Sequence, residues 1–301
     1  MVISMIKWLN VVVYLVIVLV AVIAKEFIWV WSCMEISIVV ALVMMFLWGI
    51  KMGSIMEYYV YQTSSSLMML MGWLGGMDLV VEVSLLIKLG LFPFQTYMLK
   101  VAGELVGLMY LVVLLFQKVI PLYLIYFIFG ESALEGGVVI SSVMVSVMVG
   151  VLGGLSFASF SGLMAYSSLI HSSWLTLIIL MDTKLFIYYV LMYLSVMLVV
   201  SAYYGSVHKV SMGWMVMLMV SGFPPLVGFF LKMNMLYSGV IMYPSLFLVI
   251  MLMSSVSFLF YVRLLVLYLM GGSSVQYDTY AVGFVVVLMV VVISVLGMMV
   301  M

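Results

Sequence analysis

Long runs of apolar residues follow one another along this chain, and short polar or charged groups separate them. A helix that crosses a bilayer needs about 20 apolar residues, and only helices or closed barrels satisfy their backbone groups in lipid. The runs lack the short alternating segments of barrel strands. The pattern therefore predicts about eleven helices, over residues 4–24, 27–50, 55–77, 79–106, 108–129, 136–157, 161–181, 185–205, 212–240, 243–269 and 280–300.

Two of these segments are longer than one span needs, and each contains a helix breaker. Residues 79–106 include Pro93. Residues 212–240 include the pair Pro224–Pro225. Proline removes a backbone donor, so the freed carbonyls need cover within a membrane. Transporters place broken helices of this kind at their ion sites. We therefore expect two discontinuous helices, one in each of two related halves.

Composition supports a membrane protein and excludes several function classes. The 301 residues are 69% hydrophobic and 7% charged, whereas a soluble domain is about 25% charged. We therefore expect an all-α polytopic membrane protein with one transmembrane domain over residues 1–301. The net charge is zero, so no basic patch is available for nucleic acid.

Redox chemistry within the chain is disfavoured by its residue content. Cys33 is the only cysteine, so neither an intrachain disulfide nor a cysteine-ligated cluster is possible. Two histidines, His171 and His208, are too few for a haem-rich or copper-containing redox subunit. The loops are also too short to form a domain that binds a nucleotide.

The distribution of loop lysines predicts an orientation. With the spans given above, the side that holds the N-terminus collects Lys7, Lys51, Lys100 and Lys209, whereas the other side collects Lys25 and Lys184. Cytoplasmic or matrix loops carry an excess of lysine and arginine. The N-terminus is therefore expected on the matrix or cytoplasmic side.

Four ionisable residues fall inside predicted spans rather than at their ends. They are Glu35, Lys88, Lys118 and Lys232. A charge near the bilayer centre costs about 2.5–3.5 kcal/mol on insertion scales, and such residues mark ion paths or buried pairs. Ion pairs that only staple helices are one alternative, but one carboxylate does not neutralise three lysines. Burial disfavours the ammonium form of lysine and a nearby carboxylate favours it, so lysines in this setting can load and release a proton. The set predicts a proton relay.

His171 is a further candidate, in the sequence AYSSLIHSSW. Histidine titrates near neutrality, and its polar neighbours could hold a short water chain. These neighbours are Tyr166, Ser167, Ser168, Ser172 and Ser173. The alternative is a histidine that only forms hydrogen bonds between helices. The sequence leaves both possibilities open.

Four motifs carry a resemblance to a known family. LLIKLGLFPFQTYMLK (85–100) resembles the signature K-x-G-x-x-P-F-H, and QKVIPL (117–122) resembles Q-K-x-x-P-L. AYSSLIH (165–171) resembles A-Y-S-S-x-x-H, and GFPPLVGFFLK (222–232) resembles G-L-P-P-x-x-G-F-x-x-K. All four resemble motifs of subunit 2 of NADH:ubiquinone oxidoreductase, and they occur in the family's order. The short chain, the early glutamate at Glu35 and the few spans favour the animal mitochondrial form. The family is one of the antiporter-like membrane subunits of respiratory complex I.

The resemblance implies a fold, a location and a role. The fold would be a bundle of antiporter-like inverted repeats, with its core at about 27–269, in the mitochondrial inner membrane. The role would be proton translocation, driven by NADH oxidation and ubiquinone reduction elsewhere in the complex. NADH, FMN, iron–sulfur clusters and ubiquinone would be bound by other subunits, and this chain would hold no cofactor or metal. Its partners would be other membrane-arm subunits and the lipid bilayer.

The family's roles carry over to residues of this sequence. The resemblance implies a glutamate–lysine pair at Glu35 and Lys88, a central relay lysine at Lys118 and an exit-side lysine at Lys232. The chain departs from the family at Gln95, where a histidine is usual, so a titrating role there is in doubt. Smaller departures occur at Leu99–Lys100, Gly162–Leu163 and Ser173. A stand-alone cation/proton antiporter and a scaffold subunit that does not pump remain alternatives.

Overall fold

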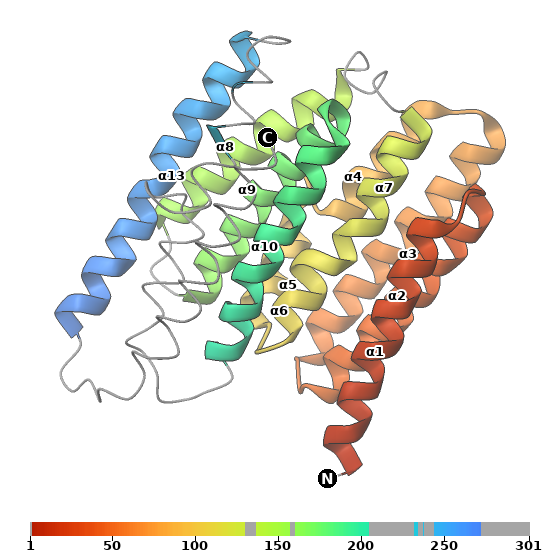
Figure 1. Cartoon of the computed structure of the whole chain (residues 1–301), viewed down its shortest axis with the longest axis horizontal. Helices are drawn as coiled ribbons and strands as arrows, with labels where there is room; N and C mark the ends of the chain where they lie inside the picture. Colours follow the sequence, from red (N-terminus) through yellow and green to blue (C-terminus); the bar gives the residue numbers. More distant parts are fainter. Residues whose placement is uncertain are drawn as a thin grey trace.

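The computed structural model describes residues 2–129, 137–156, 160–204, 232–233, 237 and 244–271 (Figure 1). Every regular element in these residues is helical. Among these residues, four helices are long and apolar enough to cross a membrane: Phe27–Leu47, Met109–Ile128, Val138–Ser156 and Ser161–Met181. The predicted all-α membrane fold is therefore confirmed.

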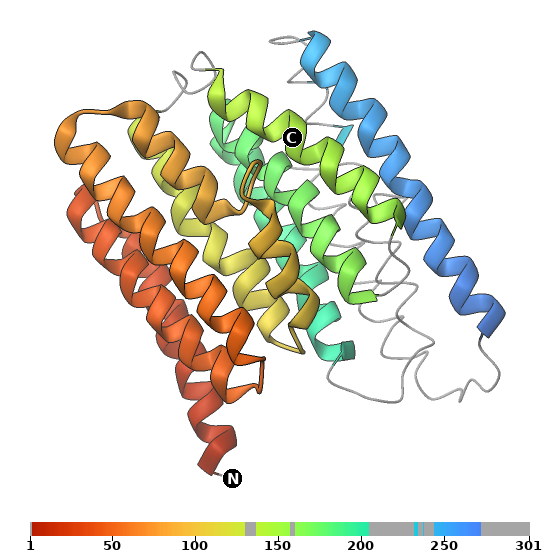
Figure 2. The ribbon, with the colours of Figure 1, turned by 180° about the vertical axis from the view of Figure 1, so that it is seen from behind.

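Most of the observed helices match the predicted spans to within a few residues. They are α1 (Val2–Ile23), α2 (Phe27–Leu47), α3 (Met52–Gly75), α8 (Val138–Ser156), α9 (Phe160–Met181), α10 (Thr183–Tyr204) and α13 (Pro244–Gly271). Helices α1, α2 and α3 form one edge of the bundle, and α13 lies at the opposite edge (Figures 1 and 2). The predicted spans 212–240 and 280–300, with the break at Pro224–Pro225, lie outside the described residues or almost entirely so.

The break predicted at Pro93 is present. Helix α4 (Asp78–Leu89) ends at Gly90, and α5 (Gln95–Glu104) begins after a short turn. With 12 and 10 residues, each is too short to cross a bilayer alone. Gly90 adopts φ +67°, a left-handed conformation that favours glycine. Residues 78–104 thus form two half-helices, joined by the five non-helical residues 90–94.

The segment predicted as one helix over 108–129 has an unpredicted irregularity. A short helix, α6 (Met109–Leu111), leads into a π-helical stretch, η1 (Val112–Phe116), and then into α7 (Gln117–Phe129). Such π-helical turns often occur at functional sites. The stretch ends at Phe116, two residues before Lys118, so the backbone departs from α-helical geometry close to a candidate relay residue.

Helix α9 is the most buried of the four long apolar helices. Its spanning window is 94% buried, against 44% for that of α2. It packs closely on α8: a Cβ at Gly150 would lie 2.7 Å from Ile170, and one at Gly153 would overlap the ring of Tyr166. Small residues allow membrane helices to approach in this way. Helix α9 is therefore central to the described bundle.

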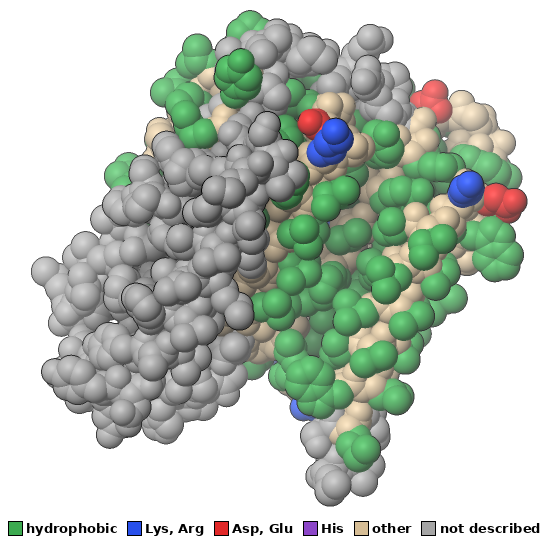
Figure 3. All heavy atoms as spheres, in the orientation of Figure 1, with side chains coloured by type: hydrophobic (Ala, Val, Ile, Leu, Met, Phe, Trp, Pro, Cys, Tyr) green, Lys and Arg blue, Asp and Glu red, His purple; other side chains and the backbone are tan. Residues whose placement is uncertain are grey.

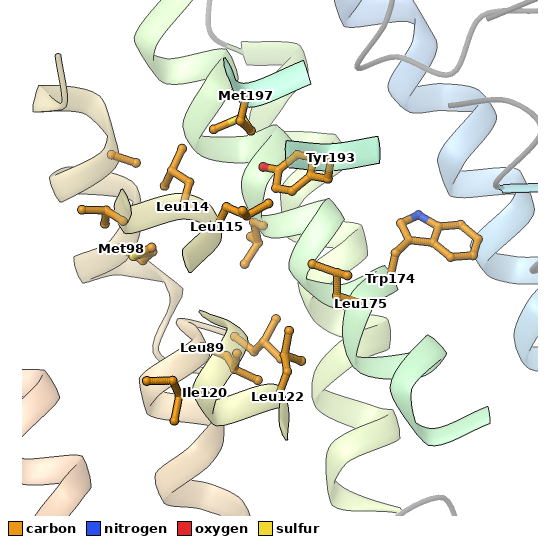
Figure 4. Close-up of a cluster of buried hydrophobic side chains, with 14 of the residues drawn as sticks. Leu89, Met98, Leu114, Leu115, Ile120, Leu122, Trp174, Leu175, Tyr193 and Met197 are labelled. Carbon is orange, nitrogen blue, oxygen red and sulfur yellow. The ribbon is translucent and has the colours of Figure 1, made fainter. Parts of the chain in front are cut away.

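An apolar cluster occupies the interior between these helices. Figure 4 shows part of it, with Leu89 from α4, Met98 from α5, Ile120 and Leu122 from α7, and Leu175 from α9. All five side chains are buried. The outward-facing side chains are also mostly hydrophobic, with charged ones near the ends of the helices (Figure 3). Apolar residues on both the inside and the outside are what a lipid environment requires.

Ion pairs at one end of the bundle attach α5 to α3. Lys51 Nζ lies 2.9 Å from Glu104 Oε1, and Lys100 Nζ lies 2.9 Å from Glu57 Oε1. Ser54 donates a hydrogen bond of 2.6 Å to the other oxygen of Glu104. Both ion pairs are partly exposed, and exposed ion pairs contribute little to the free energy of unfolding. Their main effect is to fix the orientation of α5 against α3.

Replacing Gly90 by alanine tests the geometry of the break. A Cβ at Gly90 would lie 2.8 Å from Met98 Cβ, on a backbone with positive φ. We expect Gly90→Ala to destabilise the full chain by about 1–3 kcal/mol, measured as a lower thermal denaturation temperature in detergent. Gly103→Ala is the matched control, because its Cβ would meet nothing within 4 Å and its backbone is helical. Equal stability of the two variants would contradict a strained turn at Gly90.

Candidate functional site

The turn between α4 and α5 leaves backbone groups that no helix satisfies. In a continuous helix the Lys88 carbonyl would accept from the Phe92 N–H. Here Gln62 of α3 donates its Nε2–H to the Lys88 carbonyl at 3.2 Å. The Phe92 N–H instead donates to Ser146 Oγ of α8 at 2.7 Å. Two neighbouring helices thus replace the hydrogen bond that the break removes.

Tyr97 of α5 provides a third link across the break. Its hydroxyl donates to the Ile87 carbonyl and accepts a hydrogen bond from Gln62 Nε2 at 3.2 Å. Its ring stacks on Tyr61, with centroids 4.6 Å apart. Gln62 and Tyr97 are both buried. One amide and one hydroxyl therefore join α3, α4 and α5 at the level of Lys88.

The structure brings Lys88 and Glu35 together. Lys88 Nζ lies 3.7 Å from Glu35 Oε1, and the Lys88 side chain is fully buried, whereas the Glu35 side chain is 29% exposed. The separation is longer than a direct charge-assisted hydrogen bond of about 2.7–2.9 Å. Lys88 Nζ has no hydrogen-bond acceptor among the described residues. The Lys88 ammonium therefore forms an ion pair with Glu35 but makes no direct hydrogen bond to it.

Lys118 is buried in a different environment. Its Nζ donates to the Ser168 carbonyl of α9 at 3.1 Å. Among the described residues, no carboxylate lies within ion-pair distance of it. The preceding residue, Gln117, accepts a hydrogen bond from the hydroxyl of Tyr14 in α1. Lys118 thus has a neutral acceptor but no counter-charge in the described part of the chain, and a buried ammonium is costly in that setting.

His171 lies on the same helix as the carbonyl that Lys118 contacts. It follows Ser168 by three residues, so the two positions share one face of α9. His171 Nδ1 lies 2.7 Å from the Tyr189 hydroxyl of α10, and its ring stacks on Tyr193 with centroids 4.6 Å apart. The imidazole therefore connects α9 to α10 at the depth of Lys118.

The serines around His171 are bonded to their own helix. Ser167, Ser168, Ser172 and Ser173 each donate to a carbonyl three or four residues earlier. Their hydroxyl donors are therefore used, and only acceptor lone pairs remain for a water. The predicted water chain at these serines stays a prediction.

Lys232 and Gln95 are the remaining positions that the sequence analysis singled out. Lys232 is buried, in the short described stretch 232–233, so its link to Lys118 stays a prediction. Gln95 opens α5, and its buried Oε1 has no hydrogen-bond donor among the described residues. Within the described part of the chain, no three His, Cys, Asp or Glu side chains gather as a metal site would require.

The chain is similar in sequence to curated proteins that share one name. No family model matches the chain. It is 30% identical over 171 residues to NADH-ubiquinone oxidoreductase chain 2 of Suncus etruscus, covering 52% of this chain and 49% of that one. It is 32% identical over 194 residues to the protein of the same name from Mytilus edulis, covering 58% and 59%. The chain thus spans about half the length of the curated relatives it matches.

Solved structures share the fold. A chain of respiratory complex I from Thermus thermophilus superimposes with a TM-score of 0.82 at 17% identity, over 97% of this chain and 77% of that chain. A chain of the Mrp complex from Dietzia superimposes with a TM-score of 0.75 at 14% identity, over 85% and 59%. The names of the curated relatives confirm the resemblance read from the motifs, and the solved structures show the same fold.

Replacing Gln62 tests how the break is satisfied. Gln62→Leu leaves the buried Lys88 carbonyl without its side-chain donor, and we expect it to destabilise the full chain by about 1–3 kcal/mol. Gln95→Leu is the matched control, since it removes an amide whose buried oxygen has no donor among the described residues. Thermal denaturation in detergent measures both. If Gln62→Leu were no more destabilising than Gln95→Leu, the hydrogen bond to Lys88 would not stabilise the break.

Proposed function

We propose that this chain is a proton-translocating core membrane subunit of NADH:ubiquinone oxidoreductase in the mitochondrial inner membrane. The names of its relatives and its likeness to a chain of respiratory complex I support this assignment. NADH oxidation and ubiquinone reduction would take place in other subunits, which would bind NADH, FMN, iron–sulfur clusters and ubiquinone. The N-terminus would face the matrix, and the chain would contact lipid and other membrane-arm subunits.

The observation that carries the proposal is a fully buried lysine beside a partly exposed carboxylate, at a break in a membrane helix. Lys88 and Glu35 are 3.7 Å apart. A carboxylate at this distance favours the ammonium form, whereas burial favours the neutral amine. A change in the charge or distance of Glu35 would therefore make Lys88 take up or release a proton. Glu35 would act as the modulator and Lys88 as the first carrier.

Lys118 would be the next carrier. Helices α4 and α7 are in contact, and they hold Lys88 and Lys118. A proton leaving Lys88 Nζ would pass through water to a neutral Lys118, which becomes an ammonium hydrogen-bonded to the Ser168 carbonyl. Because no described carboxylate neutralises Lys118, its charged state would be short-lived. That property suits a relay residue better than a structural one.

His171 would assist the onward step. The Tyr189 hydroxyl at its Nδ1 fixes the orientation of the ring. The imidazole lies one turn along α9 from the carbonyl that holds Lys118, so it could accept a proton from Lys118 through water. Lys232 would complete the path to the far side of the membrane.

A scaffold subunit that does not pump is the second candidate. The ion pair of Lys88 with Glu35 and the contact of Lys118 with the Ser168 carbonyl favour it, because each contact joins two helices. In a scaffold, these contacts would only join helices. The two candidates differ in what happens to proton pumping when a lysine is removed without loss of assembly.

Replacing Lys118 by methionine tests the relay in a genetically tractable organism whose complex contains a homologous chain. Methionine keeps the length and apolar stem of the side chain but carries no proton. We expect the rate of coupled proton transfer to fall by about a hundredfold or more, while NADH oxidation by an artificial electron acceptor is unchanged. Proton uptake by membrane vesicles and NADH oxidation are measured on the same preparation.

Lys184→Met is the control for that experiment, since Lys184 is exposed at the start of α10. A native gel checks that both variants assemble. Full pumping per NADH in an assembled Lys118→Met complex would rule out the relay and leave the scaffold.

A further inference from the structure

Gln117 lies at the junction between the π-helical turn η1 and helix α7, one residue before Lys118. Its side chain is buried, and the proposed relay gives it no role. Its backbone closes the turn, because the Gln117 N–H donates to the Val112 carbonyl five residues earlier. Hydrogen bonds over five residues define a π-helix. The geometry of the turn therefore depends on where Gln117 is held.

The π-helical turn determines which way Lys118 points. In an α-helix each N–H bonds to the carbonyl four residues earlier, so a π-helical turn contains one extra residue. If η1 relaxed to an α-helix, α7 would turn by about 100°, because an α-helix has 3.6 residues per turn. Lys118 Nζ would then leave the Ser168 carbonyl of α9, to which it donates at 3.1 Å. The contact of Lys118 thus depends on the turn being kept.

A buried hydroxyl of α1 holds the side chain of Gln117. Tyr14 Oη donates a hydrogen bond to Gln117 Oε1, across 103 positions of the chain. Both side chains are buried. A buried polar group that loses its partner costs free energy. The bond therefore opposes any rotation of α7 that would separate the two side chains.

Two consecutive residues at the start of α7 are thus bonded to two different helices. Gln117 is held by α1 and Lys118 by α9, and consecutive side chains of a helix point about 100° apart. The side chains of η1 are apolar, and the packing of apolar groups has no preferred direction. Leu114 and Leu115 of the turn lie in the apolar cluster of Figure 4. The bond from Tyr14 therefore supplies a directional contact beside Lys118.

We propose that Gln117 is a positioning residue for Lys118. The bond between Tyr14 Oη and Gln117 Oε1 keeps η1 in its π-helical form, and this form directs Lys118 Nζ to the Ser168 carbonyl. Neither Tyr14 nor Gln117 carries the proton. The inference rests on the proposed function, in which Lys118 is a proton carrier, but the position of Lys118 is measured independently of pumping.

Two single variants and their combination separate positioning from stability. Gln117→Leu leaves the Tyr14 hydroxyl without its acceptor, and Tyr14→Phe leaves the Gln117 oxygen without its donor. Each should lower the thermal denaturation temperature of the full chain in detergent, because a buried polar group loses its partner. The double variant replaces both partners by apolar groups, which is close to neutral for stability. Its denaturation temperature should therefore return toward that of the unmodified chain.

Proton pumping should not return with stability. The pumping experiment uses the organism of the Lys118→Met test, chosen so that its chain has a tyrosine and a glutamine at these two positions. We expect coupled proton transfer in the assembled double variant to fall about tenfold, the loss that corresponds to one hydrogen bond. Tyr59→Phe is the control, since Tyr59 is an exposed tyrosine of α3. Pumping that recovers in the double variant along with stability would overturn the proposal, because the bond would then only be structural.

A cryo-EM map of the assembled double variant tests the position of Lys118 directly. We expect η1 to relax to an α-helix and Lys118 Nζ to lie beyond hydrogen-bond distance of the Ser168 carbonyl. A Lys118 that still donates to this carbonyl, after an unchanged π-helical turn, would overturn the proposal. If the double variant does not assemble, the map is obtained for Tyr14→Phe, which removes one oxygen and keeps the ring.

The outcomes distinguish this inference from the proposed function. Loss of pumping in Lys118→Met, with full pumping in an assembled Gln117→Leu complex, would overturn the role of Gln117 and leave the relay intact. Full pumping in both complexes would overturn the relay, and the map would then decide whether Gln117 positions Lys118.

Discussion

Backbone groups freed inside a membrane helix must find partners within the protein, and the arrangement around residues 88–93 follows from that requirement. The turn between α4 and α5 removes the hydrogen bond between the Lys88 carbonyl and the Phe92 N–H. Gln62 from α3 and Ser146 from α8 replace it. These two side chains have to lie at the depth of the break, so the break fixes how α3 and α8 pack around it. The ion pairs of Glu57 and Glu104 then hold the far end of α5 on α3.

The same break places Lys88 at the end of a half-helix, beside a carboxylate that can pair with its ammonium. A lysine in the middle of an unbroken apolar helix would be surrounded by lipid or by apolar side chains, and its ammonium would be costly. Here α4 ends one residue later, and Glu35 of α2 lies within ion-pair distance. Lys118 also lies beside an irregular backbone, just after the π-helical turn η1, but its amine contacts a carbonyl, whereas that of Lys88 pairs with a carboxylate. At both lysines an irregular backbone and a buried amine occur together.

Sequence reasoning predicted some of these features and missed others, for physical reasons. Pro93 lacks an N–H, so the break could be read from one residue, and Glu35 and Lys88 stood out because charge is rare in the spans. The partners of the break could not be read in this way. Gln62 and Ser146 are ordinary polar residues in apolar helices, and only tertiary packing brings them within 3.2 Å of freed groups. The π-helical turn before Lys118 has no sequence signal that we recognise. The left-handed Gly90 was also missed, because a glycine within an apolar run is compatible with many conformations.

The claim at the centre of the proposed function is that protons pass between Lys88 and Lys118 through water. The most direct measurement is a cryo-EM map of the assembled complex, at a resolution that shows ordered water around this chain. We expect waters to connect Lys88 Nζ to Lys118 Nζ, with successive polar atoms within about 3.2 Å of one another. A dry gap between the two amines, filled by apolar side chains in every state of the complex, would contradict the relay.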